Sequence, residues 1–250
     1  MTFGLSYDII IIPNEIEVIK MIDKRINYIL ILDTETANTH AEDDKLDMSD
    51  VLFYDIGFAV IDKRGKVYEK ASFVNSDIFV YERDLMKSAY YAHKIPLYIE
   101  DLRNGSRVMK NTYEIKKYIY DLIQKYNIKV VCAHNSYFDL TACNNTQRWS
   151  TKSKFRYFFP YGIEIWDTMK MANDTICKQK LYKEFCEVNG YLTANGQVRK
   201  TAEILYRYIT QNIDFVESHT GLEDVMIEKE ILAHCFRQHK KMQKNLFKKA

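Results

Sequence analysis

The sequence predicts an α/β fold built on a mixed sheet of five strands, with the first three strands antiparallel and helices packed against the sheet. Three observations support this prediction. A continuous apolar run, YILILD, fills residues 28–33 and is typical of a strand buried on both faces. Two strand-like runs follow at 52–62 and 66–74, close enough to form a hairpin. Beyond them, short apolar runs alternate with helical patterns, which favours strand–helix units.

The segments around the first strands are polar or amphipathic. Residues 14–26, NEIEVIKMIDKRI, carry isoleucines at helical spacing and predict a short helix outside the main core. The acidic stretch THAEDDKLDMSD, 39–50, predicts an exposed loop. Residues 62–65, Asp-Lys-Arg-Gly, are typical of a turn and are expected to join the second strand to the third.

The second half of the chain predicts two more strands and several helices. Asn111 and Glu114 have the spacing of a capping box, so a helix is expected to begin there. The runs IKVVCAH, 128–134, and EIWDT, 164–168, predict the fourth and fifth strands. A small hairpin is expected around Asn195-Gly196. Closing helices are expected from the patterns TAEILYRYI and LEDVMIEKEILAHCF.

The amino-acid composition excludes several classes of protein but does not identify a binding partner. The chain has 47% hydrophobic and 28% charged residues and a net charge of +2, which neither requires nor excludes nucleic acid. Its five cysteines are widely spaced and form no CxxC pair, which excludes a disulfide framework or zinc cluster of ordinary spacing. The first apolar run is too short for a signal peptide, and no stretch has the length of a membrane span. We therefore expect a cytoplasmic protein with no membrane partner.

Two acidic residues close the first strand. Asp33 and Glu35 stand two apart, so both side chains point to the same side of a strand. Carboxylate oxygens are the ligands that Mg²⁺ and Mn²⁺ prefer. The alternative is a solvated strand end, because the chain has 34 acidic residues and such triplets arise by chance.

A second acidic residue pattern follows the strand at 128–134. If Asn135 caps the next helix, Asp139 lies in the first turn of that helix, at the same end of the sheet as Asp33. The alternative is that Asp139 only complements the positive helix terminus. Taken alone, this motif favours the alternative.

A third pattern, His219-Thr-Gly-Leu-Glu-Asp224, precedes the last helix. Thr220 and Glu223 fit a capping box, which leaves Asp224 free in the first turns. His219, just before the helix, could take a proton from water at neutral pH. Nearby carboxylates would raise the pKa of His219 and bound cations would lower it. His134 stands at the same spacing from Asp139, and we interpret it as structural.

These motifs together resemble a known family. ILDTET, AHNSYFD and SHTGLED are similar, in order and spacing, to the three motifs of the DEDDh exonucleases. This ribonuclease H-like family includes polymerase proofreading subunits, ribonuclease T and oligoribonuclease. The resemblance runs over residues 28–236, and includes Asp-Ile-Gly at 55–57 and Asp167-Thr168. The segment 190–201 has no counterpart in the general family pattern.

The resemblance implies a fold, an activity and a division of the chain. It implies a ribonuclease H-like fold and a metal-dependent 3′→5′ exonuclease that releases nucleoside 5′-monophosphates. The exonuclease domain would span 28–237, with an N-terminal extension at 1–27 and a basic, frayed tail at 238–250. The implied substrate is single-stranded nucleic acid with a free 3′ end, DNA slightly before RNA, and a polymerase is a further candidate partner.

The resemblance also assigns roles at the site. Asp33, Glu35 and Asp224 would hold one of two Mg²⁺ (or Mn²⁺) ions, and Asp33 would bridge to the second. Asp139 would support the site directly or through metal-bound water, and His219 would deprotonate the attacking water. We assign Asp167 to helix capping. Expected substrate-binding residues are Thr34, Thr36, Asn135, Phe138 and Arg148.

Other substrate features leave two readings open. Residues 148–157 interleave basic and aromatic side chains, which suits single strands, but a solvated loop over buried rings gives the same pattern. Tyr90, Tyr91 and His93 could pack at a terminal base, although we favour core packing. Two alternatives to a DNA exonuclease stand: an RNA-directed enzyme of the same chemistry, and a catalytically idle module that binds nucleic acid or a polymerase. The presence of all five catalytic-type residues favours an enzyme.

Overall fold

The computed structural model describes residues 22–37, 40–42, 45–87, 89 and 91–247. The helix expected over 14–26 lies mostly outside the described residues. Its described end, 22–26, is a turn and not a helix, so the prediction is wrong for that part.

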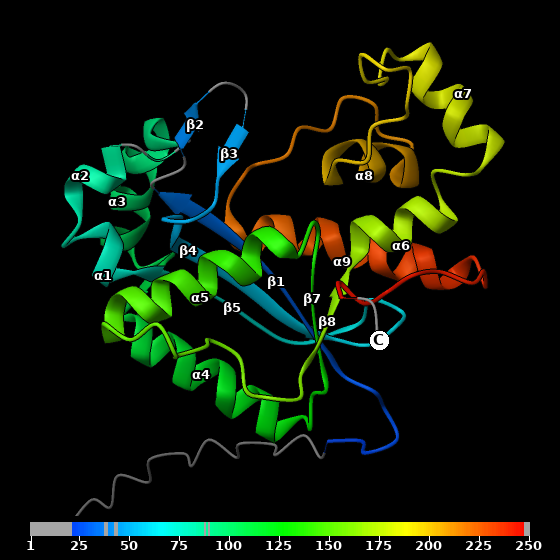
Figure 1. Ribbon diagram of the computed structural model, residues 1–250. Helices are drawn as coiled ribbons and strands as arrows, with labels where there is room; N and C mark the ends of the chain where they lie inside the picture. The colour runs from blue at the N-terminus through cyan, green and yellow to red at the C-terminus, as the bar shows by residue number, and fades with distance from the viewer. Residues whose placement is uncertain (1–21, 38–39, 43–44, 88, 90, 248–250) are drawn as a thin grey trace, which may run out of the picture.

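The core of the molecule is a sheet of six strands in the order β6-β5-β4-β1-β7-β8 (Figure 1). β1, β4 and β5 pair antiparallel, whereas β7 runs parallel to β1 and β8 parallel to β7, as the sequence predicts. A sixth strand, β6, pairs parallel to β5 and was not predicted, because three residues are too few for a periodic pattern. The strands are β1 Ile29–Ala37, β4 Leu52–Ile61, β5 Val67–Asn75, β6 Val108–Lys110, β7 Val130–Ala133 and β8 Glu164–Asp167.

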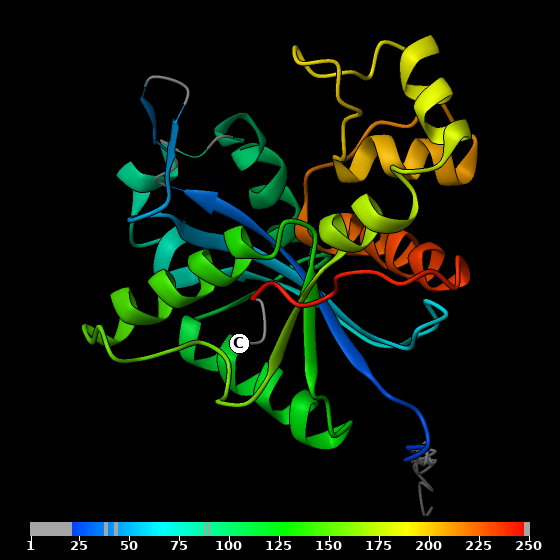
Figure 2. The ribbon, with the colours of Figure 1, turned by 45° about the vertical axis from the view of Figure 1, so that its right-hand side comes forward.

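Helices cover both faces of this sheet, with α4 and α5 on one side and α6 and α9 on the other (Figures 1 and 2). Successive side chains of β1 point to opposite faces. Leu30 and Leu32 therefore pack in the core with α4 and α5, whereas Ile29 and Ile31 pack in the core with α6 and α9. The helices are α1 Ser76–Phe79, α2 Arg83–Lys87, η1 Ala92–Lys94, α3 Ile95–Asn104, α4 Thr112–Lys125, α5 Tyr137–Thr151, α6 Thr168–Thr175, α7 Lys180–Val188, α8 Ala202–Thr210 and α9 Gly221–Arg237.

Local sequence motifs account for the turn between β4 and β5 and for the start of α4. The Asp62 carboxylate accepts the backbone N–H groups of Arg64 and Lys66, which closes the predicted turn between β4 and β5. At the start of α4 both bonds of the capping box are present, between Asn111 and Glu114. Both predictions are confirmed.

Two segments that were expected to be irregular are ordered by pairing. The acidic stretch forms a separate small sheet of β2 (His40–Glu42) and β3 (Lys45–Asp47), so the prediction of a loop is wrong for these residues. The C-terminal segment does not fray over its described residues. It runs beside β8, where the Leu246 N–H donates to the Ile165 carbonyl and the Asp167 N–H donates to the Lys244 carbonyl, both at 2.8 Å.

The remaining sequence expectations concern thiols and membranes. All five cysteines are free and buried, in agreement with their spacing. Of the helices that the structure describes, none combines the length and apolar composition that crossing a lipid bilayer would require.

Candidate active site

Parallel pairing brings the first two acidic motifs to one edge of the sheet. Asp33 and Glu35 lie near the carboxyl end of β1. β7 is parallel to β1, so the segment after β7, which carries Asp139, emerges at this same edge. The carboxyl ends of parallel strands are the usual place for ligands in such sheets.

The third motif reaches this edge because α9 packs on β4 with almost no side chain between them. A Cβ atom added to Gly57 on β4 would lie 2.1 Å from the carbonyl carbon of Gly221. A Cβ atom added to Gly221 would lie 2.5 Å from the Gly57 nitrogen. Only glycine at both positions permits this approach, which carries Asp224 to Asp33 and Glu35.

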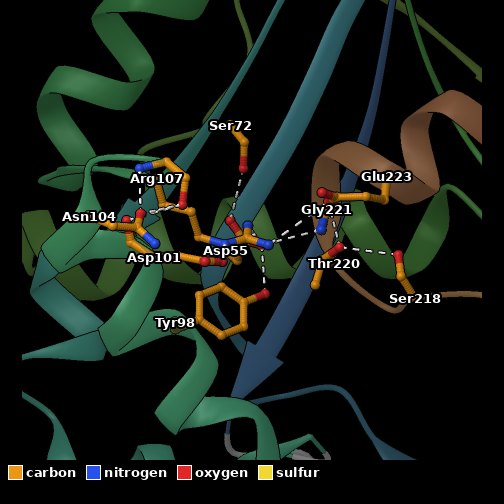
Figure 3. A network of polar contacts seen from close by, with 11 residues as sticks. Asp55, Ser72, Tyr98, Asp101, Asn104, Arg107, Ser218, Thr220, Gly221 and Glu223 are labelled. Carbon is orange, nitrogen blue, oxygen red and sulfur yellow. Dashed lines mark hydrogen bonds and ion pairs between the residues drawn. The ribbon is translucent and has the colours of Figure 1, made fainter.

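A buried carboxylate fixes the start of α9 (Figure 3). Asp55 of β4 is fully buried and accepts hydrogen bonds from the Tyr98 hydroxyl at 2.7 Å, the Ser72 hydroxyl at 3.2 Å and the Gly221 N–H at 3.2 Å. Arg107 lies 3.4 Å from the same carboxylate. Burial raises the pKa of Asp55, while Arg107 acts in the opposite direction.

This arrangement corrects the capping box that the sequence predicts at the start of α9. Thr220 is the N-cap residue, but its side chain accepts no backbone N–H; its hydroxyl donates to the Glu223 carboxylate. Asp55, from another strand, accepts the first N–H instead. Sequence spacing alone could not reveal an acceptor so distant in the chain.

Three carboxylates form a cluster suited to a cation. Oxygens of Asp33, Glu35 and Asp224 all lie within 4.8 Å of one another. Asp224 Oδ1 is buried and has no hydrogen-bond partner among the described residues. A buried, unpaired carboxylate oxygen is costly unless a cation or donor satisfies it. An all-oxygen donor set with such an atom fits Mg²⁺ or Mn²⁺.

The electrostatics of the cluster point the same way. Burial, and then repulsion from Asp139 and Glu228, raises the pKa of Asp33 well above its usual range. Burial also raises the pKa values of Glu35 and Asp224 to about 8, with neighbouring carboxylates adding to the effect. A bound divalent cation would reverse these shifts because it favours the ionised forms.

Asp139 lies beside the cluster and is held by β1. Its Oδ1 accepts both the Thr34 N–H at 3.1 Å and the Thr34 hydroxyl at 2.8 Å. Burial raises the pKa of Asp139 to about 7, although these bonds favour its ionised form. Thr34, expected to bind substrate, therefore orients Asp139 in this structure.

His219 borders the same cavity and is held from two sides. Its ring stacks on Tyr91, with centroids 4.5 Å apart and planes 16° apart. Lys94 donates to the backbone carbonyls of Ser218 and His219. Burial, and then Lys94, lowers the pKa of His219, which favours the neutral imidazole that can accept a proton. Tyr91 lines the cavity and is not a core residue.

The sequence missed two further carboxylates that line this cavity, Glu217 and Glu228. Glu217 Oε2 lies 3.8 Å from His219 Nδ1. Glu228 is buried, and its Oε2 accepts a hydrogen bond from the backbone N–H of His134 at 3.2 Å. Burial and the nearby carboxylates raise the pKa of Glu228 well above its usual range. Glu228 stands four residues after Asp224 on α9, so the same helix face carries both, and this spacing could have revealed it.

His134 and Asp167 have the structural contacts that the sequence suggested. The two ring nitrogens of His134 lie 2.8 Å from the Thr168 hydroxyl and 2.7 Å from the Lys200 carbonyl. Asp167 caps α6 by accepting the Met169 N–H at 2.9 Å.

The cavity over the cluster has a volume of about 730 Å³ and gathers most of the expected substrate-binding residues. Thr34, Thr36, Asn135 and Phe138 border it. Arg148 does not, because it lies nine residues beyond Asp139 on α5, roughly 14 Å along the helix axis. Asn135 does not cap α5: the N-cap residue is Ser136, and the Asn135 carbonyl accepts the Phe138 N–H at 2.9 Å.

Comparisons with known proteins show the fold. No family model matches the sequence, and no curated protein sequence matches it. A 3′-exonuclease described in recognition of the histone mRNA stem-loop aligns over 88% of this chain and 86% of its own, with TM-score 0.56 and 11% identity. The nuclease domain of 3′hExo, a DEDDh family member bound to rAMP, aligns over 90% and 100%, with TM-score 0.50 and 10% identity.

A third solved structure is larger than this chain. Escherichia coli exonuclease I in complex with a 5cy-dT13 oligonucleotide aligns over 86% of this chain and 41% of its own, with TM-score 0.51 and 13% identity. The chain thus has the ribonuclease H-like fold found in DEDDh exonucleases, as the sequence predicts.

Proposed function

We propose that this chain is a metal-dependent 3′→5′ exonuclease that releases nucleoside 5′-monophosphates, with residues 28–237 as its exonuclease domain. The observation that carries the proposal is the cluster of Asp33, Glu35 and Asp224, whose oxygens lie within 4.8 Å of one another at the edge of the sheet. A catalytically idle fold would have no reason to hold two buried carboxylates, Glu35 and Asp224, against the half-buried Asp33, because their ionisation without a cation destabilises the protein.

The residues present fit Mg²⁺ or Mn²⁺, and we propose two such ions. Asp33, Glu35 and Asp224 would hold one ion, Asp33 would also contact the second, and Asp139, oriented by Thr34, would support the site. When bound, such ions stabilise the charge that develops on the attacking and leaving oxygens of a phosphodiester. The unpaired Asp224 Oδ1 supports this assignment independently of the family resemblance.

The chain itself would supply the proton transfer. His219, neutral at pH 7 because its pKa is lowered, takes a proton from the attacking water. The new phosphorus–oxygen bond forms as the bond to the 3′ oxygen of the preceding nucleotide breaks. That oxygen takes a proton from solvent, and the imidazolium returns its proton to solvent. The products are a nucleoside 5′-monophosphate and a strand one nucleotide shorter with a new 3′ hydroxyl. Tyr91 and Lys94 hold the imidazole in place during this step.

The proposed substrate is single-stranded nucleic acid with a free 3′ end, with DNA placed slightly before RNA. A cavity of about 730 Å³ is of the size that takes a small ligand and not a duplex. A polymerase is a candidate partner, and the five free, buried cysteines agree with a cytoplasmic location.

The test is a time course with 5′-labelled single-stranded DNA and RNA in Mg²⁺, Mn²⁺ or chelator. We expect a ladder that shortens from the 3′ end, loss of activity in chelator, and recovery with either ion. A bulky block on the 3′ hydroxyl should slow the reaction strongly. The Asp33→Asn variant, purified in parallel, should be inactive and excludes a contaminating nuclease.

Two outcomes would replace the proposal. Digestion of a circular single strand at the linear rate would indicate an endonuclease. Strand binding without cleavage in either ion would indicate the idle binding module.

A further inference from the structure

A segment that the family pattern does not contain forms one wall of the catalytic cavity. Residues 191–201 connect α7 to α8, which lie beyond α9 in Figure 2. An antiparallel bridge joins Leu192 to Val198, and the Thr193 N–H donates to the Gln197 carbonyl at 2.7 Å. The Asn195-Gly196 hairpin expected from the sequence is therefore present, and its return half, 197–201, borders the cavity.

Two side chains from elsewhere in the fold hold this wall through its backbone. The Tyr182 hydroxyl donates to the Arg199 carbonyl at 2.7 Å. His134 Nε2 lies 2.7 Å from the Lys200 carbonyl, and because a carbonyl can only accept, this nitrogen carries the proton. His134 directly follows β7, so the wall is tied to the same sheet edge as Asp139.

The wall and the floor of the cavity carry opposite charges. The floor carries the Asp33, Glu35 and Asp224 carboxylates, whereas the wall carries Arg199 and Lys200. Arg199 is exposed. Among the described residues its guanidinium makes one hydrogen bond, a long one of 3.4 Å from Nε to the Leu192 carbonyl. Both terminal nitrogens of Arg199 are thus available to a ligand.

We propose that Arg199 binds a backbone phosphate of the single-stranded nucleic acid, next to the phosphate that is cleaved. The inference rests on the proposed function, since the acidic floor is assigned to the cations that meet the cleaved phosphate. A guanidinium presents two parallel donors that match phosphate oxygens. Tyr182 donates to the Arg199 carbonyl and His134 donates to the neighbouring Lys200 carbonyl, so the Arg199 side chain starts from an anchored backbone.

The test is equilibrium binding of a 5′-fluorescent oligothymidylate, in Mg²⁺, to the full chain carrying Asp33→Asn so that no cleavage occurs. In this background Arg199→Gln should raise the Kd about tenfold, as expected for a lost hydrogen bond to a charged group. The slope of log Kd against log salt should fall by about 0.7, the value for one phosphate contact on a single strand. Arg199→Lys should restore the slope.

Arg64→Gln is the matched control. Arg64 lies in the turn between β4 and β5, at the opposite end of the sheet from the cavity. Like Arg199→Gln, the substitution Arg64→Gln removes one exposed positive charge. Its Kd and salt slope should equal those of the parent. Equal values for Arg199→Gln and Arg64→Gln would overturn the proposal.

The cleavage rate provides an independent readout in the active protein, which keeps Asp33. Arg199→Gln should raise KM for a long strand and leave kcat near wild type, whereas a loss of kcat with unchanged KM would overturn a binding role. If the wild-type chain cleaves nothing but Arg199→Gln still weakens binding, the exonuclease proposal fails and the phosphate contact stands. If the chain cleaves strands and Arg199→Gln binds them normally, the phosphate contact fails alone.

Discussion

The Asp55 carboxylate accepts the Gly221 backbone N–H at 3.2 Å, although 166 residues separate the two in sequence. This bond joins the central β4 to the first turn of α9, the helix that carries Asp224. The position of one proposed metal ligand thus depends on a buried carboxylate that does not itself face the cavity.

Replacing Asp55 with alanine should destabilise the protein by about 1–3 kcal/mol, because it leaves the buried Tyr98 hydroxyl and the Gly221 N–H without their acceptor. The measurement is urea unfolding, followed by an assay of the folded fraction for cleavage. Asp101→Ala is the control, since Asp101 also pairs with Arg107, at 3.0 Å, but is partly exposed. A loss no larger than that of the control would contradict the central role of Asp55.

The metal-free protein should lose stability as pH rises. The folded-state pKa is about 8 for Glu35 and Asp224 and about 7 for Asp139, whereas unfolded carboxylates titrate near ~4. Between these values the folded chain binds more protons than the unfolded chain, so the free energy of unfolding decreases with increasing pH. We expect the Tm in chelator to be lower at about pH 8 than at about pH 5.

Added Mg²⁺ should raise the Tm more at the higher pH, because the ion binds ionised carboxylates. Asp33→Asn removes one repelling group and should flatten both trends. A Tm in chelator that increases across this range would show that the carboxylates are not held as described.

His219→Asn should lower kcat by roughly 10²–10⁴-fold and leave metal affinity nearly unchanged, the range expected for loss of a positioned base. The pKa of His219 is lowered from its usual value, so the wild-type rate should fall with acid only below about pH 6.5. Lys94→Met removes the cation beside the imidazole and should move this limb to higher pH. Near-normal turnover in the Asn variant would show that His219 only shapes the loop.

Glu228 offers a matched pair of substitutions. Glu228→Gln keeps an oxygen that can accept the His134 N–H and removes a buried carboxylate, so stability at about pH 8 in chelator should be equal or higher. Glu228→Leu removes the acceptor and should cost about 1–3 kcal/mol in urea unfolding. Equal stability of the two variants would mean that this hydrogen bond contributes little.

Local chemistry explains which parts of the fold could be predicted. The apolar run of β1, the turn at Asp62 and the capping box at Asn111 each depend on residues within a few positions of one another. The acidic motifs could also be predicted from the sequence. The geometry of a strand end positions Asp33, and the geometry of a helix start positions Asp139. Parallel pairing of β1 with β7 then follows from the strand–helix alternation and brings both to one edge.

What the sequence by itself determined is therefore the order of the five main strands, β1, β4, β5, β7 and β8, and the carboxylates that converge. Tertiary structure alone decided that Asp55 and not Thr220 satisfies the start of α9 and that the C-terminal segment pairs beside β8. It also decided that 191–201 walls the cavity while Arg148 stays outside it. Each of these depends on groups that meet from distant parts of the chain, or from neighbouring elements whose packing angle no local pattern encodes.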